Sequence, residues 1–382
     1  MVIIRILILF TLLASLSACR LSGPLRTIMQ GDMTMDGGMT MDGDMSMDGD
    51  MNMSGQIATT MRSDNLASRL VSVPVYGNPE CTPSVSGRTG TPCGPALGKI
   101  AVLDIDGLLV NKNIGGFGSL GENPVALFRE KLDAIAGDPS ITAIVLRINS
   151  PGGGVTAADI MARDLLQVKQ SRNLPVVACV MDVGTGAGYY LACTADAIVA
   201  HPTSIVGGIG VILNAYNMEV AIEQFSIASI PIKAGEHIDI ASPEREMKLD
   251  ERAMLQAMAD EFHQRFIDHV QRTRPEITDT EIFDGRVITG LRSAELKLVD
   301  RIGYLDDAVV QARQMANLPA DAPLVMLRRD NDRAYTLLDV TPIAPTMSSL
   351  IPLKLPGLDR SSLPTFLYLW QPEPSLVTAS GG

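Results

Sequence analysis

The chain has 382 residues, of which 46% are hydrophobic and only 4% aromatic, and its formal net charge is −12. The length allows one large domain or two small ones, and the aliphatic composition favours α/β layers over an aromatic-rich β-sandwich. The acidic balance argues against nucleic acid as a partner and against binding to anionic lipid through charge. Any membrane attachment therefore needs another source.

The N-terminus indicates export and a lipid anchor. Arg5 precedes an apolar run over residues 6–18, which is too short to span a bilayer stably and is typical of a secretory signal peptide. The run ends in Leu-Ser-Ala followed by Cys19, a sequence that resembles the bacterial lipobox, in which the cysteine is lipidated. We therefore expect a signal peptide over residues 1–18 and a membrane-anchored lipoprotein on the exported side of the cell envelope. Arg20, where an aspartate would favour the inner membrane, favours the outer membrane if the cell has one.

Residues 19–97 are predicted to be a disordered linker. Between residues 33 and 56 a Met-Thr-Met-Asp-Gly pattern recurs every six residues, with almost no branched or aromatic side chains to bury. The favoured interpretation is a tether, and the alternative is a copper(I) site, because thioether sulfur is a soft ligand. Cys81 and Cys93 flank a stretch rich in Pro, Ser, Gly and Thr and could pair as a disulfide in an exported protein.

The pattern changes at residue 98, where strand-like and helix-like segments begin to alternate. Apolar runs predict strands over 99–104, 142–148, 175–181, 197–200 and 204–212, with a further strand over 286–289. Helical periodicity predicts helices over 124–136, 155–168, 189–195, 249–272, 293–299 and 305–315. This alternation indicates an α/β domain over residues 98–327. Cys179 and Cys193 fall in such elements and are expected to be buried, unreactive side chains.

The last part of the chain, residues 328–382, is predicted to be a proline-rich tail. Within it, residues 365–370 form an isolated apolar segment. A free apolar patch would be a liability in water, so we expect this segment to dock on the domain or on a neighbouring subunit.

Glycine-rich motifs carry the functional information. Asn149-Ser150-Pro151 is followed by Gly152, Gly153 and Gly154, at the end of one predicted strand and before a helix. Glycines there allow backbone N–H groups to face a ligand, so the loop is a candidate oxyanion site and substrate groove. A second strand runs into Thr185-Gly186-Ala187-Gly188-Tyr189-Tyr190, and further motifs lie at 205–211, 232–243 and 285–303.

The order and spacing of these motifs resemble the signal peptide peptidase A family of serine peptidases across residues 98–316. This resemblance implies the ClpP/crotonase fold, self-association into rings or domes, and peptide ligands. It implies no cofactor. It also places the family's catalytic serine at Gly186 and its catalytic lysine at Ile238.

Neither position can play the family's role. Gly186 has no side chain to act as a nucleophile, and Ile238 cannot accept a proton as a base. Thr185 and His237 are the neighbouring candidates for a relocated nucleophile and base. Each is shifted by one residue, which turns its side chain away from the expected direction. The alternative roles are a helix N-cap for Thr185 and a solvated loop residue for His237. No metal site is predicted.

Four functions remain open from the sequence. The favoured one is a non-catalytic family member that binds peptides as a scaffold or regulator and assembles with itself or with an active paralogue. The second is a working serine-type endopeptidase that uses shifted residues. The third is a crotonase-like acyl-thioester enzyme, for which no cluster of basic residues stands out. The fourth is a copper-binding methionine repeat with a passenger domain.

Overall fold

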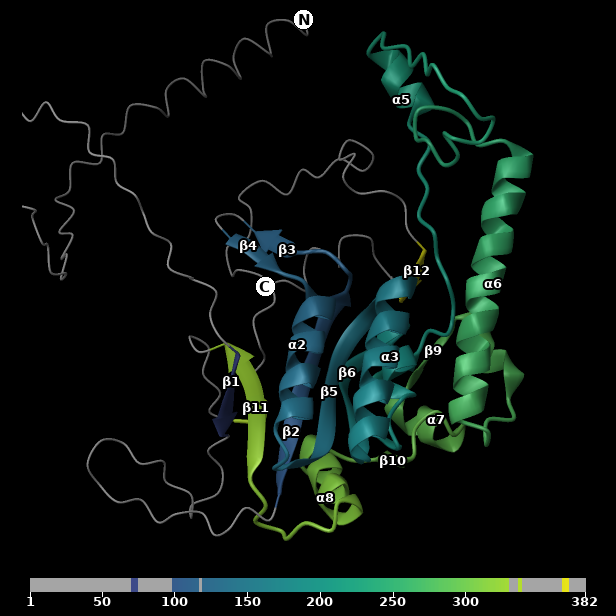
Figure 1. Ribbon diagram of the computed structural model, residues 1–382. Coiled ribbons are helices and arrows are strands. Elements are labelled where there is room, and N and C mark those ends of the chain that lie inside the picture. Colours follow the sequence, from purple (N-terminus) through teal and green to yellow (C-terminus); the bar gives the residue numbers. More distant parts are fainter. Residues whose placement is uncertain (1–69, 75–97, 117–118, 330–335, 339–365, 371–382) are drawn as a thin grey trace, which may run out of the picture. The chain divides into compact units, whose positions relative to one another are not determined.

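The structure is a computed structural model that describes residues 70–74, 98–116, 119–329, 336–338 and 366–370 (Figure 1). Cys19, the methionine repeat, Cys81 and Cys93 lie outside the described residues, so the lipid anchor, the copper hypothesis and the disulfide remain predictions. Among the helices that are described, none combines the length and the apolar character needed to cross a membrane.

A mixed β-sheet forms the centre of the domain. Its strand order is β1 (Leu70–Pro74), β11 (Leu324–Arg329), β2 (Lys99–Leu109), β5 (Ile141–Gly154), β6 (Val176–Thr185), β7 (Ala197–Ala200) and β10 (Arg301–Ile302). The strands from β11 to β10 are parallel, and β1 is antiparallel to β11. The short strand β8 (Ile205–Gly207) pairs in parallel with the last three residues of β6 and antiparallel with β9 (Val287–Thr289). A small hairpin joins β3 (Ile114–Gly116) to β4 (Ser119–Glu122).

Both faces of the sheet are covered, which explains the nearly continuous apolar runs of its strands. On one face, side chains of α2 (Pro124–Gly137), α3 (Val155–Arg172), α4 (Ala187–Ala192) and the last turns of α6 (Leu249–Thr273) join the larger core. On the other face, α8 (Leu305–Met315) packs on β2, β5, β6 and β7 in a second core. Two short helices, α5 (Glu219–Gln224) and α7 (Gly290–Glu295), and a 3-10 turn (Thr280–Asp284) complete the described elements.

The predicted α/β architecture is confirmed, and the strand at 197–200 and the helix at 305–315 have the expected bounds. The predicted strand over 204–212 ends at Gly207, because Gly207 and Gly208 both adopt positive φ. The predicted helices over 189–195 and 293–299 are each displaced towards lower residue numbers, to 187–192 and 290–295.

The domain extends beyond the limits expected from the sequence. Residues 70–74, which the sequence assigned to the linker, pair with β11 as β1. Residues 367–369, assigned to the tail, pair with the end of β5 as β12 (Leu367–Leu369). The predicted docking of the apolar tail segment on the domain is therefore confirmed.

Candidate functional site

The glycine stretch that was expected to be a loop is the last part of strand β5. Gly152 has a φ of 128°, a conformation that side-chain-bearing residues rarely adopt. A Cβ on Gly153 would lie 2.6 Å from the carbonyl carbon of Leu109, because the end of β2 passes directly behind it. Ser150 fixes the start of this stretch: its hydroxyl donates to the Gly107 carbonyl (2.7 Å) and accepts from the Gly152 N–H (3.2 Å).

Gly186 lies at the turn between strand β6 and helix α4. Its φ of 52° and ψ of −121° let the chain turn sharply from the strand into the helix. Its N–H donates to the Gly207 carbonyl (3.0 Å), and its carbonyl accepts from the Tyr190 N–H (2.9 Å). A strand, a tight turn and a helix N-terminus form the setting in which enzymes present an exposed nucleophile. Here the position carries no side chain.

Thr185 does not serve as the N-cap of α4, because Gly186 takes that position. Thr185 is fully buried, and its hydroxyl donates to the Pro151 carbonyl at 3.0 Å. This bond ties the end of β6 to the glycine stretch of β5. The proton of the only hydroxyl beside Gly186 in sequence is thus already committed to a backbone acceptor.

Position 238 lies in the segment between β8 and α6, here called the 213–248 segment. Ile238 is 71% exposed, and the neighbouring His237 is half-buried, with its Nδ1 3.9 Å from Oε1 of Glu251. Glu251 is in the first turn of α6, whereas Phe266 of the same helix packs against Tyr190 of α4, the helix that begins after Gly186. Fifteen residues of helix separate the two, or about 22 Å at 1.5 Å per residue. Within one chain, the structure does not bring His237 or Ile238 to Thr185 and Gly186.

An ion network holds the 213–248 segment on α6. The Arg245 guanidinium donates to both carboxylate oxygens of buried Glu251 (2.6 and 2.8 Å) and to those of Asp239 (2.9 Å each). Lys233 adds a bond of 2.6 Å to Asp239. These charged hydrogen bonds lower the pKa of Glu251 to about 2, and they hold the pKa of Asp239 well below its usual range.

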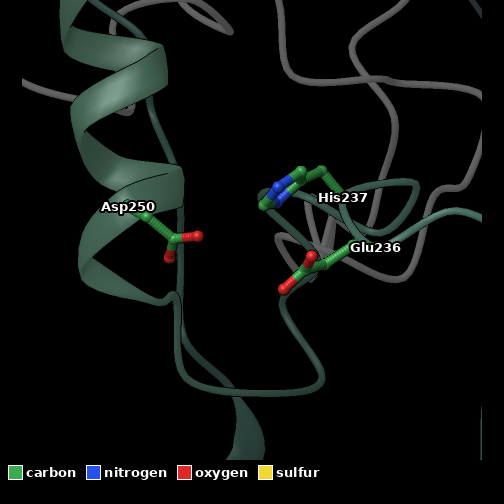
Figure 2. A group of neighbouring side chains, drawn as sticks. All are labelled: Glu236, His237 and Asp250. Carbon is green, nitrogen blue, oxygen red and sulfur yellow. The ribbon is translucent and has the colours of Figure 1, made fainter.

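Three side chains of this region could face one ion. Figure 2 shows Glu236 and His237 on the loop and Asp250 on the first turn of α6, and their ligand atoms lie within 4.8 Å of one another. Carboxylate and imidazole are ordinary ligands of divalent metals. However, both carboxylates are exposed, and the Lys248 ammonium lies 3.6 Å from Glu236 and supplies a cation already. We therefore assign no metal to this group.

The space above Gly186 holds the chain's own strand β12. A Cβ added to Gly186 would overlap the Tyr368 carbonyl oxygen and lie 2.6 Å from the Tyr368 carbonyl carbon. The same carbonyl oxygen would overlap a Cβ on Gly152. Gly152 and Gly186 thus lie directly against β12. Gly152, Gly153, Gly154 and Gly186, which lie where the sequence predicted a groove, are here called the groove floor. The sequence indicated this groove through the glycines but did not indicate its occupant.

Two buried cysteines behave as expected from the sequence. Cys179 is completely buried in β6, and burial raises the pKa of its thiol to about 12. Cys193 follows α4, and burial raises its pKa to about 11. Both thiols stay protonated near neutral pH, so neither is a substitute nucleophile.

Comparison with known proteins finds a peptidase family model and several relatives named as proteases. Residues 168–319 match the model of peptidase family S49. The chain is 30% identical over 201 residues to the chloroplastic serine protease SPPA of Arabidopsis thaliana, covering 52% of this chain and 29% of that protein. It is 29% identical over 246 residues to Protease 4 of Salmonella typhi, covering 64% of this chain and 37% of that one.

Among solved structures, a lysine-to-alanine mutant of a membrane-bound stomatin-specific protease, in complex with a substrate peptide, matches with 14% identity and a TM-score of 0.37. That match covers 66% of this chain and 93% of the other. Over the first curated relatives, the chain spans from 29% to 69% of their length.

Proposed function

We propose that this chain, a homologue of the S49 serine peptidases with their ClpP/crotonase-like fold, binds peptides in the cell envelope without cleaving them. It is held to the membrane by a lipid on Cys19 and acts as a scaffold or regulator. The observation that carries this proposal is the chemistry of the groove floor: a peptide backbone lies there, but among the described residues no nucleophile and base meet there.

Loss of the nucleophile has a large effect on the rate of peptide cleavage. Removing the nucleophile of a triad-type protease lowers its rate by about 10⁶, and the residual rate comes from binding and oxyanion stabilisation. Gly186 offers neither a hydroxyl nor room for one, since a Cβ there would lie 2.6 Å from the Tyr368 carbonyl carbon. Ile238 offers no basic nitrogen, and it is highly exposed on the 213–248 segment.

The alternative of a relocated Thr185–His237 dyad would need a second chain. Thr185 is buried with its hydroxyl bonded to Pro151, and His237 sits beside the first turn of α6. A neighbouring subunit could bring its own 213–248 segment to this groove. The same requirement applies to an active paralogue that would contribute serine and lysine from its own chain.

Association with further chains is part of the proposal. The 213–248 segment exposes apolar side chains that a monomer would leave in water: Val220 (66%), Phe225 (78%), Ile230 (83%) and Ile232 (100% exposed). Exposed apolar clusters of this kind mark sites of protein or membrane contact. The partner that this proposal favours is a second copy of the chain or a paralogue.

The direct test is hydrolysis of a panel of quenched fluorescent peptides by the full-length chain in detergent. We expect turnover about 10⁶ below that of an active serine peptidase, which is too slow for this assay to detect. The controls are Thr185→Val and His237→Ala, assayed alongside. Turnover that disappears in either variant would establish the relocated dyad and refute the proposal, whereas turnover that persists unchanged in both would be traced to a contaminating peptidase.

A further inference from the structure

Helix α6 is attached to the domain near one end only. The structure describes all 25 of its residues, and four of them are buried: Glu251, Phe266, His269 and Val270. Glu251, in the first turn, is bonded to Arg245 and fastens the 213–248 segment to the helix. The other three lie in the last turns, where Phe266 and Val270 join the larger core of the sheet. The 213–248 segment, which includes α5, is therefore carried at the opposite end of α6 from the buried contacts of the helix (Figure 1).

One of these three buried side chains is titratable. His269 is 6% exposed, and its ring stacks on the Tyr190 ring of α4, with 4.1 Å between centroids and 22° between planes. Its Nε2 lies 3.0 Å from the Tyr190 carbonyl oxygen, which can only accept a hydrogen bond, so Nε2 carries a proton. In the neutral ring Nδ1 then carries none. Acid adds a proton at Nδ1 and turns a buried neutral ring into a buried charge.

A cavity gives His269 access to water. It lies between α3 and α6, has a volume of about 960 Å³, and is lined by His269, Tyr190 and Phe262. Exposed side chains such as Gln167 and Gln264 also line it, so it is open to solvent. The charged side chains of its lining are Arg163, Arg265, Arg272, Asp159, Glu261 and Asp268. Their formal charges cancel, so the cavity offers a protonated imidazole no excess of negative charge.

The charges closest to His269 along its helix disfavour the protonated ring. Arg265 and Arg272 lie four residues before it and three residues after it, and therefore on the same side of α6. Asp159 of α3 favours protonation, but it already accepts from the Arg265 guanidinium (2.6 Å) and from the Tyr190 hydroxyl (3.3 Å). Burial has the largest effect on the pKa of His269 and lowers it below the ordinary value of 6.5, which the bond to the Tyr190 carbonyl opposes only in part.

We propose that His269 makes the attachment of α6 sensitive to acid, and that the 213–248 segment loses its fixed position on the domain when this ring is protonated. A charged ring gains hydration when it leaves Tyr190 for the cavity, and that movement removes one of the three buried contacts in the last turns of the helix. Arg274, directly after the helix, stays bonded to Asp300 (2.7 and 2.8 Å) and serves as the pivot. One consequence rests on the proposed function: association of chains through the 213–248 segment becomes weaker in acid.

The direction of the pH dependence follows from the lowered pKa. The attached state binds fewer protons at His269 than the detached state, so attachment is strongest above pH 6.5 and weakens as the pH falls below 6.5. One proton changes this equilibrium by at most about tenfold at pH 5.5. Glu251 and Asp239, whose pKa values are lowered, keep their charges at that pH. The bonds between the 213–248 segment and α6 therefore persist while the attachment of α6 weakens.

Hydrogen exchange measured by mass spectrometry tests the attachment in the full-length chain in detergent. Exchange is followed at pH 7.5, 6.5 and 5.5 and corrected for the intrinsic rate at each pH. In the native chain, exchange over residues 262–273 should rise by about three- to tenfold at pH 5.5, while β5 changes little. His269→Gln keeps an N–H donor for the Tyr190 carbonyl but cannot become charged, so it should show no such rise. His263→Gln is the matched control, because His263 lies on the same helix and bonds to the Ile209 carbonyl (3.0 Å). It should respond as the native chain does.

Arg272→Glu tests the same charge balance from an exposed position, which makes it independent of whether His269→Gln folds. It replaces a like charge with a counter-charge and should reduce the rise at pH 5.5 by about twofold or more. Equal rises in the native chain, His269→Gln and Arg272→Glu would overturn the inference. If His269→Gln is unfolded at pH 7.5, an undiminished rise in Arg272→Glu is enough to overturn it.

Sedimentation velocity at the same pH values tests the consequence for association. The native chain and His263→Gln should dissociate further at pH 5.5 than at pH 7.5, whereas His269→Gln should not. An acid-sensitive α6 without a change in association would support the role of His269 and refute the proposed contact between chains through the 213–248 segment. A chain that is monomeric at every pH would refute the association in the proposed function, and the exchange data would still decide for or against His269.

Discussion

The groove floor and the 213–248 segment are the two regions that the resemblance to peptidases assigns to the nucleophile and to the base, and they are built very differently. The groove floor is buried, rich in glycine and in backbone-to-backbone contact with β2 and β12. The 213–248 segment is held mainly by charged side chains and exposes its apolar residues. The comparison teaches that the backbone contacts of one region are complete within the chain, whereas the other region leaves large apolar side chains exposed.

The largest change in the free energy of unfolding should appear when a methyl group is added to a glycine of the groove floor. Gly153→Ala places its Cβ against the Leu109 carbonyl, and we expect a loss of about 2–3 kcal/mol in the free energy of unfolding. Gly137→Ala, at the end of α2 with no atom within 4 Å of the new methyl, should be neutral or stabilising by roughly 0.5 kcal/mol. Urea unfolding of both variants measures this. Equal stability of the two would show that β2 does not pass behind the groove floor.

The next effect concerns the charged attachment of the 213–248 segment. Arg245→Met removes the guanidinium from buried Glu251 and from Asp239, so this segment should become at least ten times more sensitive to limited proteolysis while the sheet stays intact. Lys248→Met removes an exposed pair with Glu236 and the weakest of the interactions that lower the pKa of Glu251, and it should change stability by less than about 0.5 kcal/mol. Mass spectrometry of the fragments locates the cuts. Cuts in the sheet as frequent as those in the segment would contradict the expected separation.

Acid should loosen the 213–248 segment before it loosens the groove floor. The pKa of Glu251 is lowered from 4.5 to about 2 by Arg245, and that of Asp239 is also lowered. A lowered pKa means that the stabilisation is fully present above about pH 4.5 and is lost as the pH falls towards 2. Hydrogen exchange between pH 5 and pH 2.5 should therefore rise first in this segment. Arg245→Met should already exchange quickly at pH 5 and show a smaller further increase.

The smallest effect on stability is expected from the exposed apolar side chains. Ile232→Ser changes a fully exposed residue and should alter the free energy of unfolding by less than about 0.5 kcal/mol. If the 213–248 segment is a contact between chains, the same change should weaken self-association in sedimentation velocity runs. Leu338→Ser, exposed elsewhere in the domain, is the control. An unchanged sedimentation profile for Ile232→Ser would argue that this surface has another role.

The parts of the fold that the sequence predicted depend on local patterns. Continuous apolar runs indicated the parallel strands, and helical periodicity indicated α2, α3, α6 and α8, because burial on one or both faces leaves a repeating mark. Strand β1 could not be predicted in this way. It has five residues, lies within a stretch of linker-like composition and is fixed by a partner more than 250 residues later in the chain.

The candidate site was predicted in part, for a similar reason. The glycines at 152–154 and 186 marked the groove, since close backbone approach leaves glycine as the only residue that fits. The pairing of the glycines at 152–154 with β12 was not predicted, because the partner strand is separated from them by more than 200 residues. The role of Thr185 was also missed: nothing in the sequence indicates that its hydroxyl bonds to Pro151 instead of capping α4.

Strand β12 also has a consequence for solubility. Without it, the end of β5 and the backbone of Ile212 would have unpaired hydrogen-bonding groups beside the rings of Tyr190 and Phe266. Unpaired strand edges next to apolar surface are templates for aggregation. By filling this gap with its own backbone, the chain shields both edges. Loss of the last 17 residues should therefore leave a domain that pairs indiscriminately with extended chains.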